Sequence, residues 1–392
     1  MTAVTPEWRA GENCTGCMVC AVACPKGCIG EEEREDTFLY PTMREGNCAG
    51  CGACRRVCPV ERMPVLLPPR MCLAGVRRDA SEADSASSGG AFGALAEAVA
   101  ERWEAEGFRV WVCGAAFENH FQVRHRVVRW EGAGSLGPFR KSKYVHSDTG
   151  NAMREVRRLL GDGRNRVIFS GTPCQVAGLR NLVPGADERL FCVDLVCHGG
   201  PSQRVFDRYL DSEEHRQGSC IVGYTFRNKE ILDNGTKYSR SARLEFGDGT
   251  VRRVTRFTDD YLKLFYNPAG PYRPSCERCA FKRPERIGDA TVGDAWGVQD
   301  DIPDLNPIQG ASLLLINSGS AMAFVPRLRE LMDLREWPLE RAVAGNGALG
   351  RPEPPPRGIG EPRNRFYQDI RDGRKTFREC VGDYLSALEK EH

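Results

Sequence analysis

The sequence predicts an α/β protein with a small cysteine-rich domain at its N-terminus and a larger domain that carries a short antiparallel insert. Three observations lead to this fold class: a cysteine motif repeated within residues 14–58, an alternation of helix-like and strand-like segments from residue 90 onward, and three consecutive strand-like runs in residues 220–257. The chain has 392 residues, which is enough for two or three domains with sizeable apolar cores.

The repeated motif is C-x2-C-x2-C-x3-C-P, and its second copy begins 34 residues after its first (48 minus 14). A loop of this spacing wraps one four-iron cluster: its first three thiolates bind that cluster, and the fourth reaches across to the other one. The alternatives are a disulfide knot or a pair of zinc knuckles, but zinc sites usually pair two cysteines with a distant second pair. The sequence therefore predicts a bacterial-type two-cluster ferredoxin domain over residues 1–63. The expected ligands are Cys14, Cys17, Cys20 and Cys58 for the first [4Fe–4S] cluster, and Cys48, Cys51, Cys54 and Cys24 for the second.

Composition and charge narrow the cellular compartment and the classes of partner that we expect. The chain has 18 cysteines and no apolar signal segment near its N-terminus, which favours a cytoplasmic protein whose thiols stay reduced and available to metal. No run of 18 apolar residues occurs, so we expect no membrane span. The 55 lysines and arginines are interspersed with 53 aspartates and glutamates, so we expect no nucleic-acid partner.

Beyond a linker marked by Pro64, Pro68 and Pro69, strand-like and helix-like patterns alternate over a second domain at 71–340, and 341–392 is a C-terminal extension. The alternation predicts a largely parallel sheet. A Gly-Asp-Gly turn at 247–249 supports the antiparallel insert, and the Pro- and Gly-rich stretch 351–362 predicts an extended loop. Expected helices cover residues 90–103, 153–160, 175–182, 203–210 and 377–388, and expected strands cover 108–116, 166–169, 190–196, 221–226, 239–246 and 251–257.

Four more cysteines lie where loops are expected. Cys174 and Cys197 each follow a predicted strand, and Cys276 and Cys279 form a C-x2-C. Ligands gather at the carboxyl ends of strands in open α/β sheets, so these four thiolates predict a third [4Fe–4S] cluster, with zinc on the same four as the main rival. Cys174 and Cys197 could instead be small buried residues. We expect that packing role for Cys113, Cys192 and Cys220, while Cys28, Cys72 and Cys380 fit no motif.

A flavin would make such clusters useful, because flavins convert two-electron into one-electron chemistry. Ser87-Ser88-Gly89-Gly90 precedes a helix, where backbone N–H groups can approach a phosphate, although an ordinary N-cap explains it equally. Lys143 and Tyr144 could contact the same group or form an ordinary surface pair. His146 and His198 are open to either a proton-transfer or a structural role, and the catalytic acid stays unassigned.

Seven segments together resemble one family, in the family's order: residues 87–90, 142–145, 170–179, 194–199, 225–229, 273–279 and 287–297. The chain resembles the β subunit of coenzyme F420-reducing hydrogenase and its dehydrogenase relatives, fused to an N-terminal two-cluster ferredoxin domain. One departure is Met18-Val19, which stands where a Gly-Ala type pair is frequent in such ferredoxin loops.

The resemblance implies a non-covalent FAD beside a four-iron cluster. It makes Cys174, Cys197, Cys276 and Cys279 the ligands of that cluster. Family members exchange electrons with coenzyme F420, reduce divinyl chlorophyllide, or lie in polysaccharide gene neighbourhoods. The residues expected near the flavin are Ser88, Gly89, Gly90, Lys143, Tyr144 and Thr172.

The function that follows is an iron–sulfur flavoprotein oxidoreductase. It would pass electrons between [4Fe–4S] clusters and FAD to reduce or oxidise an organic substrate or coenzyme F420, with a ferredoxin or another redox protein as partner. The alternative is a non-catalytic electron-transfer subunit that relays electrons to a partner enzyme, including one of a polysaccharide-related pathway. A weaker rival is a regulatory redox sensor.

Overall fold

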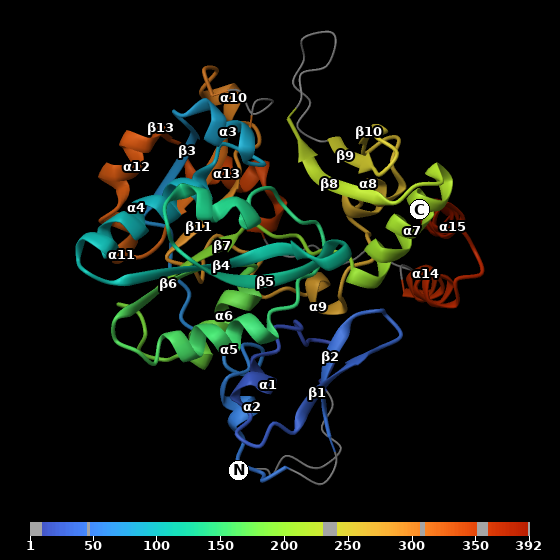
Figure 1. Cartoon of the computed structure of the whole chain (residues 1–392), viewed down its shortest axis with the longest axis horizontal. Helices are drawn as coiled ribbons and strands as arrows, with labels where there is room; N and C mark the ends of the chain where they lie inside the picture. The colour runs from blue at the N-terminus through green and yellow to red at the C-terminus, as the bar shows by residue number, and fades with distance from the viewer. Residues whose placement is uncertain (1–9, 45–47, 230–240, 306–309, 351–359, 391–392) are drawn as a thin grey trace.

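The computed structural model describes residues 10–44, 48–229, 241–305, 310–350 and 360–390. A small N-terminal part lies at one end of the molecule, next to a large mixed sheet, and a smaller sheet with the C-terminal helices lies to the side (Figure 1). The predicted fold class is confirmed, because the chain combines a cysteine-rich N-terminal part, a central α/β sheet and a small antiparallel sheet.

The N-terminal part is built from two short helices and one hairpin. Its elements are α1 (Val19–Ala23), β1 (Ile29–Glu33), β2 (Leu39–Met43) and α2 (Ala53–Arg56), and β1 pairs antiparallel with β2. Three buried cysteines, an isoleucine and a methionine make its small core, so little apolar surface holds this part together. Its cysteine loops therefore depend on the surrounding protein and on whatever the thiols bind.

The central sheet has eight strands. Their spatial order is β13-β3-β12-β11-β7-β6-β4-β5. Their bounds in that order are Met332–Glu336, Met71–Arg77, Ser312–Ile316, Ala290–Asp294, Leu190–Leu195, Asn165–Gly171, Arg109–Glu118 and Gln122–Arg129.

The prediction of a largely parallel sheet is wrong. The only parallel pairings in this sheet of the described residues join the four central strands β11, β7, β6 and β4, and every other pairing in it is antiparallel. The connection between β4 and β5 is a single turn, Asn119–Phe121, and so short a connection can join only antiparallel strands. The strand β5 was not foreseen because charged residues interrupt its apolar alternation.

Helices cover both faces of the sheet. One face packs against α4 (Ala91–Ala105), α11 (Gly319–Met322) and α12 (Val325–Leu331). The other packs against α5 (Gly150–Leu159) and α6 (Pro173–Leu182), and the same apolar cluster continues into Cys17 and Val19 of the N-terminal part. The N-terminal part therefore lies against α5 and α6 (Figure 1).

The smaller sheet forms a separate side of the molecule, as predicted for the insert. It contains β8 (Ile221–Asn228), β9 (Ser241–Phe246) and β10 (Val251–Thr255), all antiparallel. It shares an aromatic-rich core with α7 (Gln203–Gln217), α8 (Asp260–Phe265), α14 (Gly360–Asp372) and α15 (Phe377–Lys390). The remaining helices are α3 (Ala80–Ser85), α9 (Pro274–Glu277), α10 (Val298–Asp301) and α13 (Leu339–Gly345).

Two further expectations need correction or qualification. Residues 360–362 were expected in an extended loop, but they begin α14. The rest of that expected loop, residues 351–359, lies outside the described residues. Residues 239 and 240 of the expected middle strand of the insert also lie outside them. Cys220 is exposed just before β8, whereas Cys113 and Cys192 are buried in strands as expected. A polar turn between α7 and β8 accounts for the exposure of Cys220.

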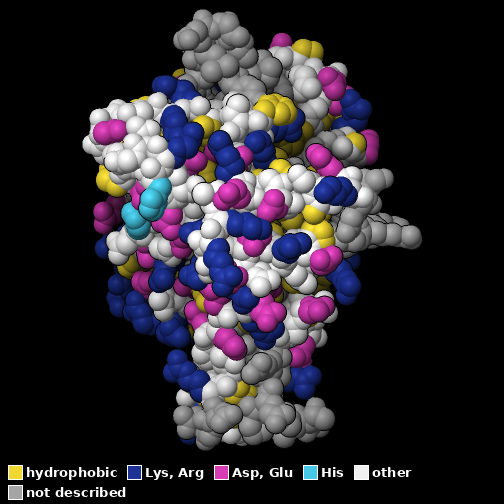
Figure 2. All heavy atoms as spheres, turned by 90° about the vertical axis from the view of Figure 1, so that its right-hand side faces the viewer, with side chains coloured by type: hydrophobic (Ala, Val, Ile, Leu, Met, Phe, Trp, Pro, Cys, Tyr) yellow, Lys and Arg dark blue, Asp and Glu magenta, His cyan; other side chains and the backbone are white. Residues whose placement is uncertain are grey.

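Within the described ranges, no helix is long and apolar enough to cross a membrane. Figure 2 shows that basic and acidic side chains are mixed over the face that carries the insert and the C-terminal helices. This mixing agrees with the nearly balanced composition of 55 basic and 53 acidic residues.

Candidate functional site

The first predicted set of thiols comes together in the structure. Burial raises the pKa of Cys17 to about 12, and the neighbouring Cys14 and Cys58 thiols act in the same direction. Burial also raises the pKa of Cys20, and the other three thiols of the set reinforce the shift. Four thiols at one buried place disfavour one another's ionisation, and a bound metal such as iron would stabilise their thiolate forms.

The second set lines one pocket. Cys24, Cys48, Cys51 and Cys54 all face it, together with Cys28, which fits no motif. The backbone N–H of Gly50 donates to the Cys48 sulfur at 3.4 Å. Cys51 is exposed, so this pocket lies nearer to solvent than the first set.

The loops suit iron–sulfur clusters because backbone N–H groups point at sulfur. Gly16 donates to the Cys14 sulfur and Val19 to the Cys17 sulfur. Such donors stabilise thiolates bound to a cluster and tune its potential. Across the described part of the chain, no three His, Cys, Asp or Glu side chains surround a point for a single metal ion. In a four-iron cluster each thiolate binds a different iron.

The third set also comes together, from three separate elements. Cys174 lies in the first turn of α6, Cys197 follows β7, and the C-x2-C loop begins in α9. The Cys279, Cys197 and Cys276 thiols all raise the pKa of Cys174, after burial itself. Gly199 has a φ of +111°, and a Cβ on it would lie 3.3 Å from the Cys276 sulfur, so the loop after β7 passes tightly over this site.

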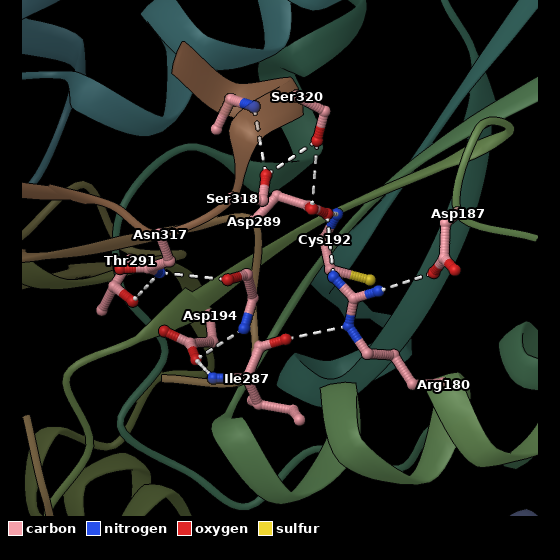
Figure 3. A network of polar contacts seen from close by, with 12 residues as sticks. Arg180, Asp187, Cys192, Asp194, Ile287, Asp289, Thr291, Asn317, Ser318 and Ser320 are labelled. Carbon is pink, nitrogen blue, oxygen red and sulfur yellow. Dashed lines mark hydrogen bonds and ion pairs between the residues drawn. The ribbon is translucent and has the colours of Figure 1, made fainter. Parts of the chain in front are cut away.

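A buried polar network ties these three elements together (Figure 3). Asp194, at the end of β7, is fully buried and accepts from the N–H groups of Ile287 and Gly288 and from the Arg286 guanidinium at 3.2 Å. Arg180 of α6 pairs with Asp289 at 3.0 Å. The chain after the C-x2-C is therefore anchored to the strand and the helix that carry the other two thiols.

The first and third sets are neighbours. Gly178 lies one helical turn after Cys174 on α6, and a Cβ on it would be 3.1 Å from the Cys17 sulfur. The Thr149 hydroxyl donates to the Cys17 carbonyl at 2.9 Å, and His146 Nε2 lies 3.1 Å from the Thr15 carbonyl. Since a carbonyl only accepts, His146 donates from Nε2.

Arg273 bridges the same two sets, and sequence reasoning did not single it out. It is 1% exposed and directly precedes α9, which carries Cys276. Its guanidinium donates to the carbonyls of Leu39 at 2.7 Å and Cys14 at 3.4 Å, and it lies over the rings of Tyr40 and Phe38. Among the described residues these carbonyls and rings are its partners, and no carboxylate pairs with it. Its sequence signals are its position before Pro274 and its place at the start of segment 273–279, which carries part of the family resemblance.

Five of the six flavin candidates lie in two adjacent segments. The Ser87 hydroxyl accepts from the N–H of Ser142 at 2.6 Å, which places residues 87–90 beside residues 142–144. The two segments therefore lie side by side, and the prediction that they hold a flavin stays a prediction.

Each of the two segments has one cation close to it, the half-buried Lys143 in one and the buried Arg77 against the other. Burial lowers the pKa of Lys143 to about 7, and its ammonium donates only to the carbonyls of Pro138 and Arg140, both at 2.9 Å. Arg77, which contacts Gly90, pairs with one carboxylate but keeps two buried guanidinium nitrogens without a partner. Each cation therefore has donor capacity that a negatively charged group could use.

Three flavin candidates have structural roles in this geometry. Gly89 is required by packing, since a Cβ there would lie 2.1 Å from the Gly75 carbonyl. The Tyr144 ring stacks on Phe265 at 3.9 Å and meets Phe226 at 5.2 Å, so it offers no open face for a flavin ring. Thr172 is the N-cap of α6, and its hydroxyl lies 3.2 Å from the Cys174 sulfur, at the third set of thiols.

The two segments and the third set are connected through aromatic side chains. His198, next to Cys197, packs against Phe265 at 4.7 Å, and Phe265 packs against Tyr144. Burial lowers the pKa of His198 to about 4, and burial together with the Arg273 guanidinium lowers the pKa of His146 to about 3. Both imidazoles are neutral at pH 7, which agrees with the structural alternative for each.

Comparison with known proteins matches both parts of the chain. Residues 164–339 match the family model for the C-terminal region of the coenzyme F420 hydrogenase/dehydrogenase beta subunit, and residues 13–61 match the model of the 4Fe-4S dicluster domain. The chain carries this family's C-terminal domain behind a dicluster domain. The resemblance noted from the sequence is thereby confirmed for these two parts of the chain.

The beta-subunit domain includes all four thiols of the third set, and the dicluster domain includes all eight N-terminal motif cysteines. No curated protein matches the chain. A similar solved chain belongs to the F420-reducing [NiFe] hydrogenase complex from Methanosarcina barkeri. It is 18% identical with a TM-score of 0.48, over 80% of this chain and 95% of that one.

Proposed function

We propose that the chain is an iron–sulfur flavoprotein that passes electrons between three [4Fe–4S] clusters and FAD, and thereby reduces or oxidises an organic substrate or coenzyme F420. The observation that carries the proposal is the serial order of the thiols. The second set includes the exposed Cys51, the first set lies between the N-terminal part and α6, and the third set adjoins Phe265 and Tyr144.

In this order the second cluster exchanges electrons with a redox partner protein. The beta-subunit family name supports such a partner, since a subunit works beside other chains. The first cluster then lies one helical turn of α6 from the third. FAD supplies the conversion between single electrons and a hydride equivalent.

The residues of the beta-subunit domain have separate tasks in this proposal. Asp194 and Arg286 hold the third cluster's loops, and Lys282 places a positive charge near Cys197 and Cys276. A cation beside a cluster favours its reduced, more negative form. Lys143 and the N-terminus of α4 would hold the phosphate-bearing part of FAD.

The deciding experiment is the iron and flavin content of the chain purified without oxygen. Three four-iron clusters with FAD predict about twelve irons and about one flavin per chain. About eight irons with zinc would assign the third set to zinc. About eight irons without flavin would leave an electron carrier built on the dicluster domain alone.

A pH titration tests the flavin half separately. Because the free Lys143 pKa is about 7 and a bound phosphate stabilises the charged ammonium, flavin affinity should be constant below pH 7 and weaken above it. The decline is at most about tenfold per pH unit for one proton. Lys143→Arg should remove this dependence, since arginine stays charged. Unchanged pH dependence of flavin affinity in that variant would show that the Lys143 ammonium does not bind the flavin.

The second candidate function, a subunit without its own turnover, is favoured by the family name alone. The chain tested by itself, with dithionite or reduced ferredoxin as donor, should reduce an acceptor such as coenzyme F420 under the first proposal. Turnover only after a partner protein is added would establish the relay function.

A further inference from the structure

We propose that Cys28 is a reserve ligand of the second cluster, able to take the place of Cys24 on iron. Cys28 is 3% exposed, and its sulfur lies 3.3 Å from the Cys24 sulfur. It faces the same pocket as the four predicted ligands of that cluster. The inference rests on the proposed function only in that the second set must hold a cluster.

The backbone holds Cys28 in place independently of Cys24. Cys28 directly precedes β1, and its carbonyl accepts from the Arg44 N–H at 2.8 Å, at the end of the β1–β2 hairpin. Between the two cysteines runs a tight turn, in which the Gly27 N–H donates to the Cys24 carbonyl and Gly27 has a φ of +59°. The turn brings both sulfurs to the same wall of the pocket, and the backbone of Cys28 is held by the adjoining β1–β2 hairpin.

Cys28 also has a second thiol as neighbour. Its sulfur interacts with both the Cys24 and the Cys48 sulfurs, and all three residues line the same pocket. Within the described residues this arrangement has no counterpart at the first cluster. There the fourth ligand, Cys58, is followed four residues later by Arg62, where the other copy has Cys28.

The ligand exchange needs no oxidant or reductant. The iron–sulfur bond to Cys24 breaks, the Cys28 thiol gives up its proton and forms the new bond, and the released Cys24 thiolate takes up a proton. Iron and sulfide keep their oxidation states. The reserve thiol lies at the cluster that includes the exposed Cys51, where reagents in solvent have the easiest access to a ligand.

Alanine variants test the proposal, because a serine oxygen can itself bind iron. In an anaerobically purified chain, Cys24→Ala should keep the iron content of the unaltered protein and change the low-temperature EPR spectrum of the reduced second cluster. Cys24→Ala/Cys28→Ala should lose about four irons. Cys58→Ala is the matched control without a reserve thiol, and it should lose about four irons as a single variant.

Three outcomes overturn the proposal: iron loss in Cys24→Ala as large as in the double variant, an unchanged spectrum in Cys24→Ala, or loss of a cluster in Cys28→Ala alone, which would make Cys28 a resident ligand. Cys28→Ala also gives a test that needs no folding of Cys24→Ala. On limited exposure to air its second cluster should decay faster than in the unaltered chain, and equal rates contradict a reserve ligand. Fewer than about eight irons in the unaltered chain would instead refute the proposed function.

Discussion

The two copies of the cysteine motif share one spacing but have different surroundings. The first copy packs against α6, and Arg273, Thr149 and His146 all bond to its backbone. The second copy is half exposed around Cys51 and keeps its near contacts local, such as Arg56 donating to the Cys51 carbonyl at 2.7 Å. The cysteines therefore specify that each copy binds an iron–sulfur cluster, while the residues between the cysteines determine which copy faces the interior of the protein.

Two loop positions show how this difference arises. Both loops need left-handed backbone at the same places: Gly16 and Met18 in the first copy, Gly50 and Gly52 in the second. Space around Gly50 is open, but a Cβ on Gly16 would lie 2.5 Å from the Arg273 guanidinium. The Arg273 side chain therefore fills the space beside Gly16, while the space beside Gly50 stays open.

The largest expected effect comes from Gly16→Ala compared with Gly50→Ala. Left-handed backbone costs an alanine about 1–2 kcal/mol at either site. At residue 16 the methyl group must also displace the buried Arg273, whose hydrogen bonds as a charged donor are worth about 1.5–3 kcal/mol each. Anaerobic urea unfolding should show Gly16→Ala destabilised by about 3–5 kcal/mol and Gly50→Ala by about 1–2 kcal/mol. Equal losses of unfolding free energy in the two variants would mean that Gly16 is no more closely packed than Gly50.

The next effect is on reduction potentials. Arg273→Gln removes a buried cation between the first cluster and the proposed third cluster, so both potentials should become more negative, while the second cluster should be unaffected. Arg55→Gln is the control, because Arg55 is exposed beside the second copy and pairs with Glu61. EPR-monitored redox titration measures all three clusters. A shift confined to the second cluster in Arg273→Gln would reverse the order of clusters proposed above.

A smaller effect is expected from exchanging the residue types at the helix starts. Met18→Gly relieves left-handed strain of about 1–2 kcal/mol but removes a buried side chain worth about 1.5–3 kcal/mol. The net loss should be about 1 kcal/mol. Gly52→Met should lose about 1–2 kcal/mol from strain alone. Thermal unfolding of both variants checks this, and a stabilised Met18→Gly would show that the Met18 side chain contributes little to the contact with α5.

Much of the site could be predicted from local sequence. Cysteine spacing placed the eight N-terminal thiols into two sets, and two predicted strand ends with one C-x2-C gave the third set. The structure brings each set together. Arg273 and Cys28 could not be predicted. The partners of Arg273 at Leu39 and Cys14 lie 234 and 259 residues away, and no periodicity carries such a contact. The mixed sheet was missed for a related reason: β11, β12 and β13 are five-residue strands whose direction depends on distant partners.

The smallest expected effect tests how tightly the first copy meets α6. In a helix, alanine is favoured over glycine by about 1 kcal/mol, and Gly93 of α4 has open space for a methyl group. Gly93→Ala should therefore stabilise the protein by about 0.5–1 kcal/mol. At Gly178 the added methyl group would lie 3.0 Å from Val19 and 3.1 Å from the Cys17 sulfur, so these neighbours must shift. Gly178→Ala should then show no gain or a loss of up to about 1 kcal/mol, and a change in the first cluster's EPR spectrum that Gly93→Ala lacks. If Gly178→Ala gains as much stability as Gly93→Ala with an unaltered spectrum, the first copy does not press on α6, and the difference between the two copies reduces to Arg273.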